Sequence, residues 1–213
     1  MIAFISTSEG RTVSGTSVTV SHTVAAGVDR ALISCIEVQS TDDITTVTFN
    51  GTSMTQYLKL NSGIVNYWNY MYRLVAPAVT TANIVASTTS ARGIICLSCD
   101  YTGVDQTTPL EANTQNLATT TNPTVAVTTL TNNAWLVGMI RVGTVAPTAG
   151  ANTTLRNFDA GDIGFIMYDT NAAQTPAGSK SLNTTSISQQ YAFTAASLKP
   201  STGNNGAGFF LLI

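Results

Sequence analysis

Asp105 and Glu111 stand on either side of a proline in the segment YTGVDQTTPLEAN (residues 101–113), just after an apolar run. Two acids in one loop are the residue types from which a catalytic pair or a metal site is built. The same residues also fit a structural turn, because an Asp side chain accepts hydrogen bonds from nearby backbone N–H groups. Pro109 fixes φ and keeps the segment from pairing as a central strand. We favour the turn and expect Asp105 and Pro109 to redirect the chain.

The single histidine, His22, lies between Val20 and Val24 on the apolar face of an alternating strand. A histidine takes part in nucleophilic catalysis only beside a positioned nucleophile or acid, and no G-x-S-x-G motif supplies one. We therefore expect a core or half-buried His22 with one ring nitrogen hydrogen-bonded. The remaining acids are thinly spread, and Asp159 and Asp162 flank a glycine in a predicted hairpin turn. We assign no catalytic residue and expect no enzymatic activity.

The three cysteines, Cys35, Cys96 and Cys99, form no metal-binding pattern with one histidine. Cys96 and Cys99 fall in one predicted strand, where a separation of three residues places them on opposite faces. An odd count argues against a disulfide framework. We expect buried, reduced thiols, no metal and no cofactor.

Trp68, Tyr70 and Tyr72 share one face of the segment NYWNYMYRL (residues 66–74). On an exposed face, these three rings would form a platform on which a sugar stacks. On a buried face, the same row is sandwich core, since large aromatic side chains dominate core energetics. The Trp68 face is the more apolar one, so we favour core and keep the sugar platform as the alternative.

The elements that position these residues are predicted to be strands. Apolar and polar residues alternate with a period of two, as in TSVTVSHTV (residues 16–24). About a dozen such runs are separated by Gly, Asn, Pro and Thr turns, and Asn50-Gly51 suits a type I′ turn with positive φ at both positions. The pattern predicts an all-β, antiparallel β-sandwich, jelly-roll-like, with little or no helix.

A single domain is expected over residues 1–213, because all-β sandwiches of this length are commonly one domain. The polar stretch at residues 112–123 is predicted to be a long loop across one end of the sandwich. The terminal segments at residues 2–6 and 207–213 are apolar, so we expect both to be tied into sheets.

The chain carries few charges: charged residues make up 9% and the net charge is −2. The sequence has no cluster of basic residues that could bind the phosphates of a nucleic acid. For the same reason we do not expect binding to an anionic membrane. No run approaches the roughly 18 apolar residues of a membrane span. No signal peptide is recognised, so we expect synthesis in a cytoplasm. A surface of low charge favours packing against partners, because copies repel each other little.

Four segments in order carry a family resemblance: VTVSHTVAAGVDRALISCIEV, TTVTFNGTSMTQ, NYWNYMYRLVAPAVTTANIVAST and CDYTGVDQTTPLEAN. Together they resemble a β-sandwich module found in phage and prophage structural proteins and in bacterial surface proteins. The matching positions are Ser21-His22-Thr23, Asn50-Gly51, Tyr72 to Pro77 and Tyr101 to Pro109. The resemblance covers the first 113 residues and implies a sandwich with an architectural role and no catalytic residues.

Composition and resemblance together lead us to expect a non-enzymatic virion structural protein of a bacteriophage. Capsid decoration (cement), head-fibre and tail-associated subunits are the kinds of protein that fit. The expected partners are copies of itself in a homo-oligomer, with a trimer favoured, and other virion proteins such as the major capsid protein. The alternative is a carbohydrate-binding module of a surface or tail protein that binds host glycans. A hydrolase is the third hypothesis, which the missing acid–base constellation disfavours.

Overall fold

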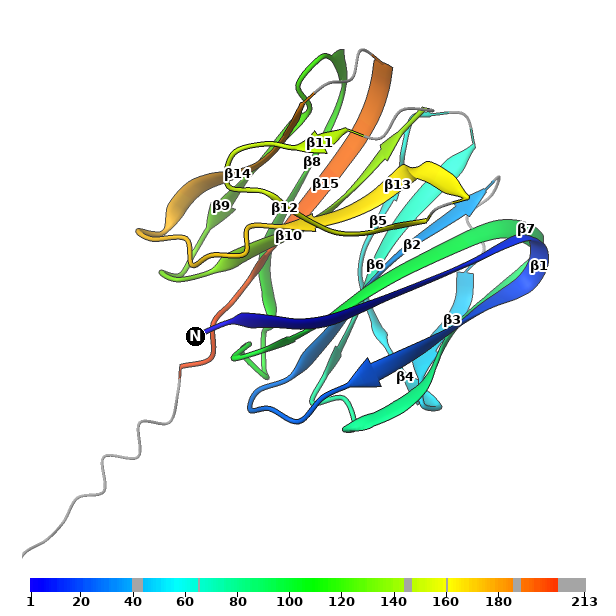
Figure 1. The fold of residues 1–213 in the computed structure, drawn as a ribbon, viewed down its shortest axis with the longest axis horizontal. Helices are drawn as coiled ribbons and strands as arrows, with labels where there is room; N and C mark the ends of the chain where they lie inside the picture. The colour runs from blue at the N-terminus through cyan, green and yellow to red at the C-terminus, as the bar shows by residue number, and fades with distance from the viewer. Residues whose placement is uncertain (40–43, 65, 144–146, 160, 186–188, 203–213) are drawn as a thin grey trace, which may run out of the picture.

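The computed structural model describes residues 1–39, 44–64, 66–143, 147–159, 161–185 and 189–202. Within these ranges the chain forms fifteen strands and no helix, which confirms the all-β, sandwich-like fold (Figure 1). The strand pairs are antiparallel. The finer jelly-roll assignment stays a prediction. The strand expected at residues 207–213 lies outside the described residues.

Two long strands build the first sheet, β1 (Ala3–Val24) and β7 (Thr80–Thr102), which pair along most of their length. The register slips on both sides of Gly15, and such bulges bend a strand. The bend places the two halves of β1 face to face. They lie so close together that a Cβ added to Gly10 would be 2.6 Å from the Val20 side chain. Figure 1 shows this doubling-back of the β1–β7 ribbon.

The first sheet has seven strands in the order β4-β3-β7-β2-β6-β5, with β1 on β7. Its remaining strands are β2 (Ala31–Gln39), β3 (Ile44–Phe49), β4 (Thr52–Ser53), β5 (Thr55–Asn61) and β6 (Tyr67–Val75). Asn50 and Gly51 join β3 to β4 with φ angles of 49° and 75°. The predicted hairpin with positive φ at both positions is therefore confirmed.

A second, five-stranded sheet has the order β12-β13-β10-β15-β8, and a third has the order β11-β14-β9. The second sheet comprises β8 (Leu110–Thr120), β10 (Trp135–Val142), β12 (Thr154–Asp159), β13 (Asp162–Asp169) and β15 (Gln189–Leu198). The third comprises β9 (Thr124–Thr129), β11 (Thr148–Ala149) and β14 (Gly178–Thr185). The turn predicted around Asp159 and Asp162 joins β12 to β13, as expected.

Three buried apolar clusters hold these layers together. One fills the inside of the folded first sheet, a second joins that sheet to the five-stranded sheet, and a third joins the five-stranded to the three-stranded sheet. β2 shows how the layers share a strand: Leu32 and Ile36 belong to the first cluster, whereas Ile33 and Cys35 belong to the second. A strand buried on both faces has a continuous apolar sequence and no alternation.

The predicted long loop at residues 112–123 is wrong. β8 runs from Leu110 to Thr120 and pairs with β15. It lies at the edge of its sheet, and every residue of it after Leu110 is half-buried or exposed. An edge strand with so little buried surface keeps polar residues on both faces, which makes its composition look like that of a loop. The expectation of a single domain stays a prediction.

Candidate functional site

Asp105 forms the structural turn that its sequence context predicts. Its Oδ1 accepts hydrogen bonds from the backbone N–H groups of Thr107 (2.9 Å) and Thr108 (2.7 Å), and its Oδ2 lies 3.2 Å from the Lys199 ammonium group. The hydrogen bond from Thr108 is the main reason that the pKa of Asp105 is lowered, and Lys199 adds to this effect. Pro109 is buried, and its carbonyl accepts the Lys199 N–H.

Glu111 does not pair with Asp105 but fixes a different turn. Its Oε1 accepts hydrogen bonds from the backbone N–H groups of Leu130 (2.9 Å) and Thr131 (3.1 Å) and from the Ser197 hydroxyl (3.1 Å). Each carboxylate is thus occupied by its own set of backbone donors. Asp105 and Glu111 therefore each stabilise a turn and do not form an acid pair.

Replacing Asp105 with alanine is expected to lower the free energy of unfolding by about 1 kcal/mol at neutral pH, the loss typical of a capping hydrogen bond. Because the folded-state pKa is lowered, this contribution is present above the unfolded-state pKa. It disappears as the pH falls through the folded-state pKa. Urea unfolding of both proteins between neutral and acidic pH measures the difference. Asp105→Asn is the matched control and should lose less, because its amide oxygen still accepts the turn bonds. Equal losses at neutral and strongly acidic pH would contradict this account.

His22 belongs to a buried polar cluster that includes Ser8 and Asp100. His22 is 2% exposed, as expected for a core histidine, and its Nδ1 lies 2.8 Å from the Ser8 hydroxyl. On the other side, His22 Nε2 lies 3.5 Å from Asp100 Oδ1. β1 doubles back and thereby brings Ser8 against His22, while β7 supplies Asp100.

The order serine, histidine, acid also occurs in nucleophilic triads, where the acid orients the ring. Here Asp100 Oδ1 already accepts the Ser6 hydroxyl at 2.6 Å, and the geometry between Nε2 and the carboxylate is not that of a hydrogen bond. Asp100 is 1% exposed. Both the acid and the ring are thus enclosed within the folded sheet, and the arrangement fits an internal polar layer better than a catalytic site.

The row Trp68, Tyr70 and Tyr72 is not an exposed sugar platform. Tyr70 is 1% and Tyr72 is 6% exposed, and both belong to the cluster inside the folded sheet. Trp68 packs against the same cluster, with the Lys59 ammonium group 5.2 Å from its ring centre. The sugar-platform alternative for these three rings is therefore corrected, and the core interpretation holds.

The three cysteines are buried and free. Cys96 and Cys99 lie in different apolar clusters, as their spacing predicts. Burial raises the pKa of Cys96 to about 11 and that of Cys99 to about 12. Because the thiolate is the reactive form, neither thiol is activated for chemistry at neutral pH.

Charged residues unexpectedly bridge the first sheet and the five-stranded sheet. The Arg141 guanidinium donates to Glu37 Oε1 at 3.0 Å, with both side chains buried. A second bridge links the Tyr101 hydroxyl to Asp169 Oδ2 (3.1 Å), which also accepts from Arg156 Nε (2.6 Å). Burial raises the pKa of Tyr101 well above its ordinary value. Burial also raises the pKa of Asp169, against the opposing effect of Arg156.

Sequence reasoning missed these bridges. Glu37 and Arg141 sit alone in apolar strands 104 residues apart. The one available signal was the presence of a charge in each otherwise apolar run. A buried charge is unfavourable without a partner. A charged residue in one apolar strand therefore indicates that an oppositely charged residue from another apolar strand lies against it.

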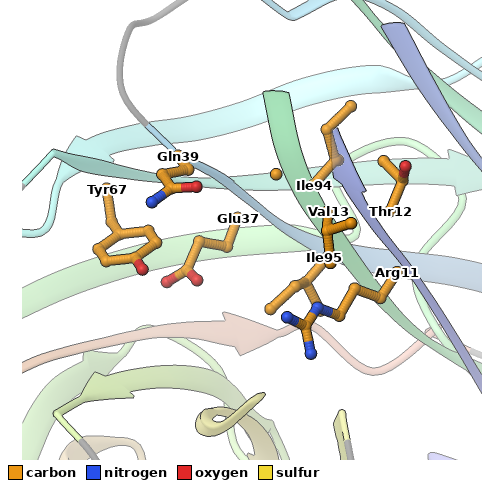
Figure 2. Close-up of a pocket in the computed structure, with 9 residues that line it drawn as sticks. Arg11, Thr12, Val13, Glu37, Gln39, Tyr67, Ile94 and Ile95 are labelled. Atoms are coloured by element: carbon orange, nitrogen blue, oxygen red, sulfur yellow. The ribbon is translucent and has the colours of Figure 1, made fainter. Parts of the chain in front are cut away.

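A cavity of about 160 Å³ opens where the last residues of β2 meet the first residues of β6. It is lined by Arg11, Thr12, Val13, Glu37, Gln39, Tyr67, Gly93, Ile94 and Ile95. Figure 2 shows the polar ends of Tyr67, Glu37 and Arg11 reaching toward the same side of the sheet. This cavity is the best candidate for a binding site, because it combines a concave volume with several polar side chains that reach toward it.

Among the described residues, no group of three or more His, Cys, Asp or Glu side chains is placed to hold a metal ion. The same part of the chain contains no helix long and apolar enough to cross a membrane. No family model, curated protein sequence or solved structure matches the chain.

Proposed function

We propose that this protein is a non-enzymatic structural subunit that assembles with copies of itself through one end of its sandwich. We propose further that the assembly is part of a virion, as a capsid decoration, head-fibre or tail-associated protein. The observation that carries the assembly proposal is the concentration of exposed apolar side chains at that one end. The virion setting is supported by the sequence resemblance alone.

The turn end, as we call it, consists of the turns at residues 25–30, 76–79, 103–109 and 130–133 with the adjoining Met1 and Val75. Backbone hydrogen bonds connect the first three of these turns, from Gly103 N–H to Val28 O and from Ala76 N–H to Arg30 O. The fourth turn is connected through Glu111, which follows the third turn by two residues and accepts a hydrogen bond from the Leu130 N–H group. Of the nine exposed large apolar side chains among the described residues, five lie here: Met1, Val28, Val75, Val79 and Leu130. Such a concentration is typical of an interaction surface.

Most of the charged side chains at the turn end are bonded within the chain, and Asp29 is the exception among the described residues. Arg30 donates to the carbonyls of Gly27 (2.6 Å) and Pro77 (3.1 Å), and Asp105 pairs with Lys199. A surface with exposed apolar side chains and few uncompensated charges meets its own copy with little repulsion. A second copy of this chain is therefore the occupant that we propose.

Identical surfaces of this kind form closed, symmetric oligomers, and we expect a trimer. A stable interface should bury at least about 1,000 Å². The jelly-roll arrangement expected from the sequence is compatible with this role, because it leaves turns free at both ends of a sandwich.

The double variant Val28→Asp/Val79→Asp is expected to be monomeric in sedimentation velocity at concentrations where the unchanged protein is oligomeric. Each aspartate would have to be desolvated in the interface, which is unfavourable. Val13→Asp is the matched control, because Val13 is 70% exposed, close to the 77% of Val28, but lies at the cavity. The control should remain oligomeric. An unchanged protein that stays monomeric, or a control that dissociates equally, would contradict the proposal.

The virion setting has its own test. Mass spectrometry of purified phage particles should detect the chain in a copy number comparable to that of other shell or tail subunits. Its absence from the particles would refute the virion setting and would leave the self-association through the turn end standing.

A further inference from the structure

The cavity described above lies at the opposite end of the sandwich from the turn end. It is lined by Gln39, the last residue of β2, and by Tyr67, the first residue of β6. The turn end instead adjoins the first residue of β2 and the last residue of β6. If copies associate through the turn end, the cavity stays open to solvent, and ligand binding in the cavity does not require that association.

The cavity wall offers hydrogen-bonding groups that the protein leaves unused. Within the described part of the chain, neither the Tyr67 hydroxyl nor the Gln39 amide has a hydrogen-bond partner. Asn69 is not part of the cavity lining, but it follows Tyr67 on the same face of β6 and pairs with Glu37, a lining residue, in the strand register. Asn69 is fully buried, and neither its amide nitrogen nor its oxygen is hydrogen-bonded to another described residue. Core packing does not explain a buried, unpaired amide, since leaving one unpaired is unfavourable.

The charges around the cavity are balanced in pairs. Arg11 lies 3.7 Å from Asp159, and Glu37 is bonded to Arg141. A free anion would meet the Glu37 carboxylate, and a free cation would meet the Arg11 guanidinium, so neither gains a net electrostatic attraction. The wall therefore favours an uncharged ligand that both donates and accepts hydrogen bonds.

The remaining walls are apolar or aromatic. Ile94 and Ile95 form part of the lining, and the Tyr67 ring is held in place by the Arg141 guanidinium, 4.1 Å from the ring centre. A volume of about 160 Å³ corresponds to roughly five water molecules. This is below the roughly 300 Å³ at which sites for drug-sized ligands begin. The site fits one small ring with an apolar face and a hydroxylated rim.

We propose that this cavity binds a single neutral sugar residue, with Gln39, Glu37 and Arg11 contacting its hydroxyls and with Tyr67 and Ile95 against its ring. Neighbouring hydroxyls of a sugar can donate to a carboxylate and accept from a guanidinium or an amide at the same time, which suits a wall of mixed sign. The ligand is either a free monosaccharide or the terminal sugar residue of a glycan chain. Both ligands offer neighbouring hydroxyl groups that donate and accept hydrogen bonds.

The test is an NMR titration of the isotope-labelled protein with glucose, galactose, mannose and N-acetylglucosamine at concentrations well above 1 mM, a range suited to a weak site. At least one sugar should shift the amide signals of residues 11–13, 37–39 and 93–95. Gln39→Ala should weaken this sugar's binding at least tenfold. Gln190→Ala is the matched control, because Gln190 is also an exposed strand glutamine but lies outside the cavity, and it should bind like the unchanged protein.

A glycan array distinguishes the two sources. Binding of array glycans that end in the responsive sugar, lost in Gln39→Ala, would identify a glycan end as the ligand, whereas response to the free sugar alone would identify a monosaccharide. The proposal is overturned if no neutral sugar shifts the cavity signals and no array glycan binds. It is equally overturned if Gln39→Ala binds normally, or if inorganic phosphate or ammonium binds in the cavity more tightly than any sugar.

Discussion

Replacing Glu37 with alanine is expected to lower the free energy of unfolding by about 3–5 kcal/mol, the loss typical of breaking a buried ion pair from one side. The Glu37 and Arg141 side chains are only 2% and 6% exposed. Without the carboxylate, the guanidinium remains between the two large sheets without its main counter-charge. Urea unfolding at neutral pH measures the change as a shift of the transition midpoint at constant slope.

Two further variants separate the ion pair from other effects. The double variant Glu37→Met/Arg141→Met removes both charges and keeps much of the side-chain volume, so it should be far less destabilised than the single variant. Lys199→Met breaks a more exposed pair, in which the lysine is 26% exposed, and should lose at most about 1 kcal/mol. A loss under 1 kcal/mol in Glu37→Ala would show that this pair does not hold the sheets together.

Asp169→Ala is expected to have an effect of similar size, again about 3–5 kcal/mol. The carboxylate accepts hydrogen bonds from the Tyr101 hydroxyl, from Arg156 Nε and from the Asn171 N–H group. Its removal leaves the fully buried Tyr101 hydroxyl without its acceptor, and it leaves the Arg156 guanidinium, which is 10% exposed, without its counter-charge and with the Asn171 side-chain oxygen as an acceptor. The measurement is the same urea transition.

Tyr101→Phe is a milder variant whose loss of stability can be compared with that of Asp169→Ala. It removes one donor and leaves the carboxylate with Arg156 and Asn171, so about 1 kcal/mol should be lost. If Tyr101→Phe and Asp169→Ala lose equal amounts, the guanidinium is not stabilised by this carboxylate, and our description of the second bridge is wrong.

The fold could be predicted where a local pattern decides it. The alternation around His22 places that residue on a buried face, and Asn50-Gly51 specifies its hairpin because both residues accept positive φ. Asp105 specifies its turn in the same local way, through backbone donors two and three residues on. These features depend only on neighbours in the sequence.

Features that depend on the position of a strand within the layers could not be predicted in the same way. β8 has the composition of a loop because it lies at the edge of a sheet, and nothing within the strand itself reveals that it is an edge. The row at Trp68, Tyr70 and Tyr72 fits either a core or an exposed surface until the folding-over of the first sheet encloses it.

The candidate site was invisible from the sequence for the same reason. Arg11, Glu37 and Tyr67 come from three strands, and the cavity between them exists only because β1 and β6 flank the central pair of strands β2 and β7. Their sequence separations carry no motif. A charge within an apolar strand, as at Glu37, was the one local sign that a partner lay across the layers.

The most direct test of the proposed assembly is amide hydrogen exchange of the unchanged protein, measured at low and at high protein concentration. We predict that a higher concentration slows exchange at the turn end, in residues 25–30, 76–79 and 130–133, and leaves exchange at residues 37–39 and 93–95 beside the cavity unchanged. Burial of these turns in an interface between copies is the physical reason, since exchange requires the amides to be exposed. Exchange that is independent of concentration throughout the chain, or that slows only at the cavity, would contradict assembly through the turn end.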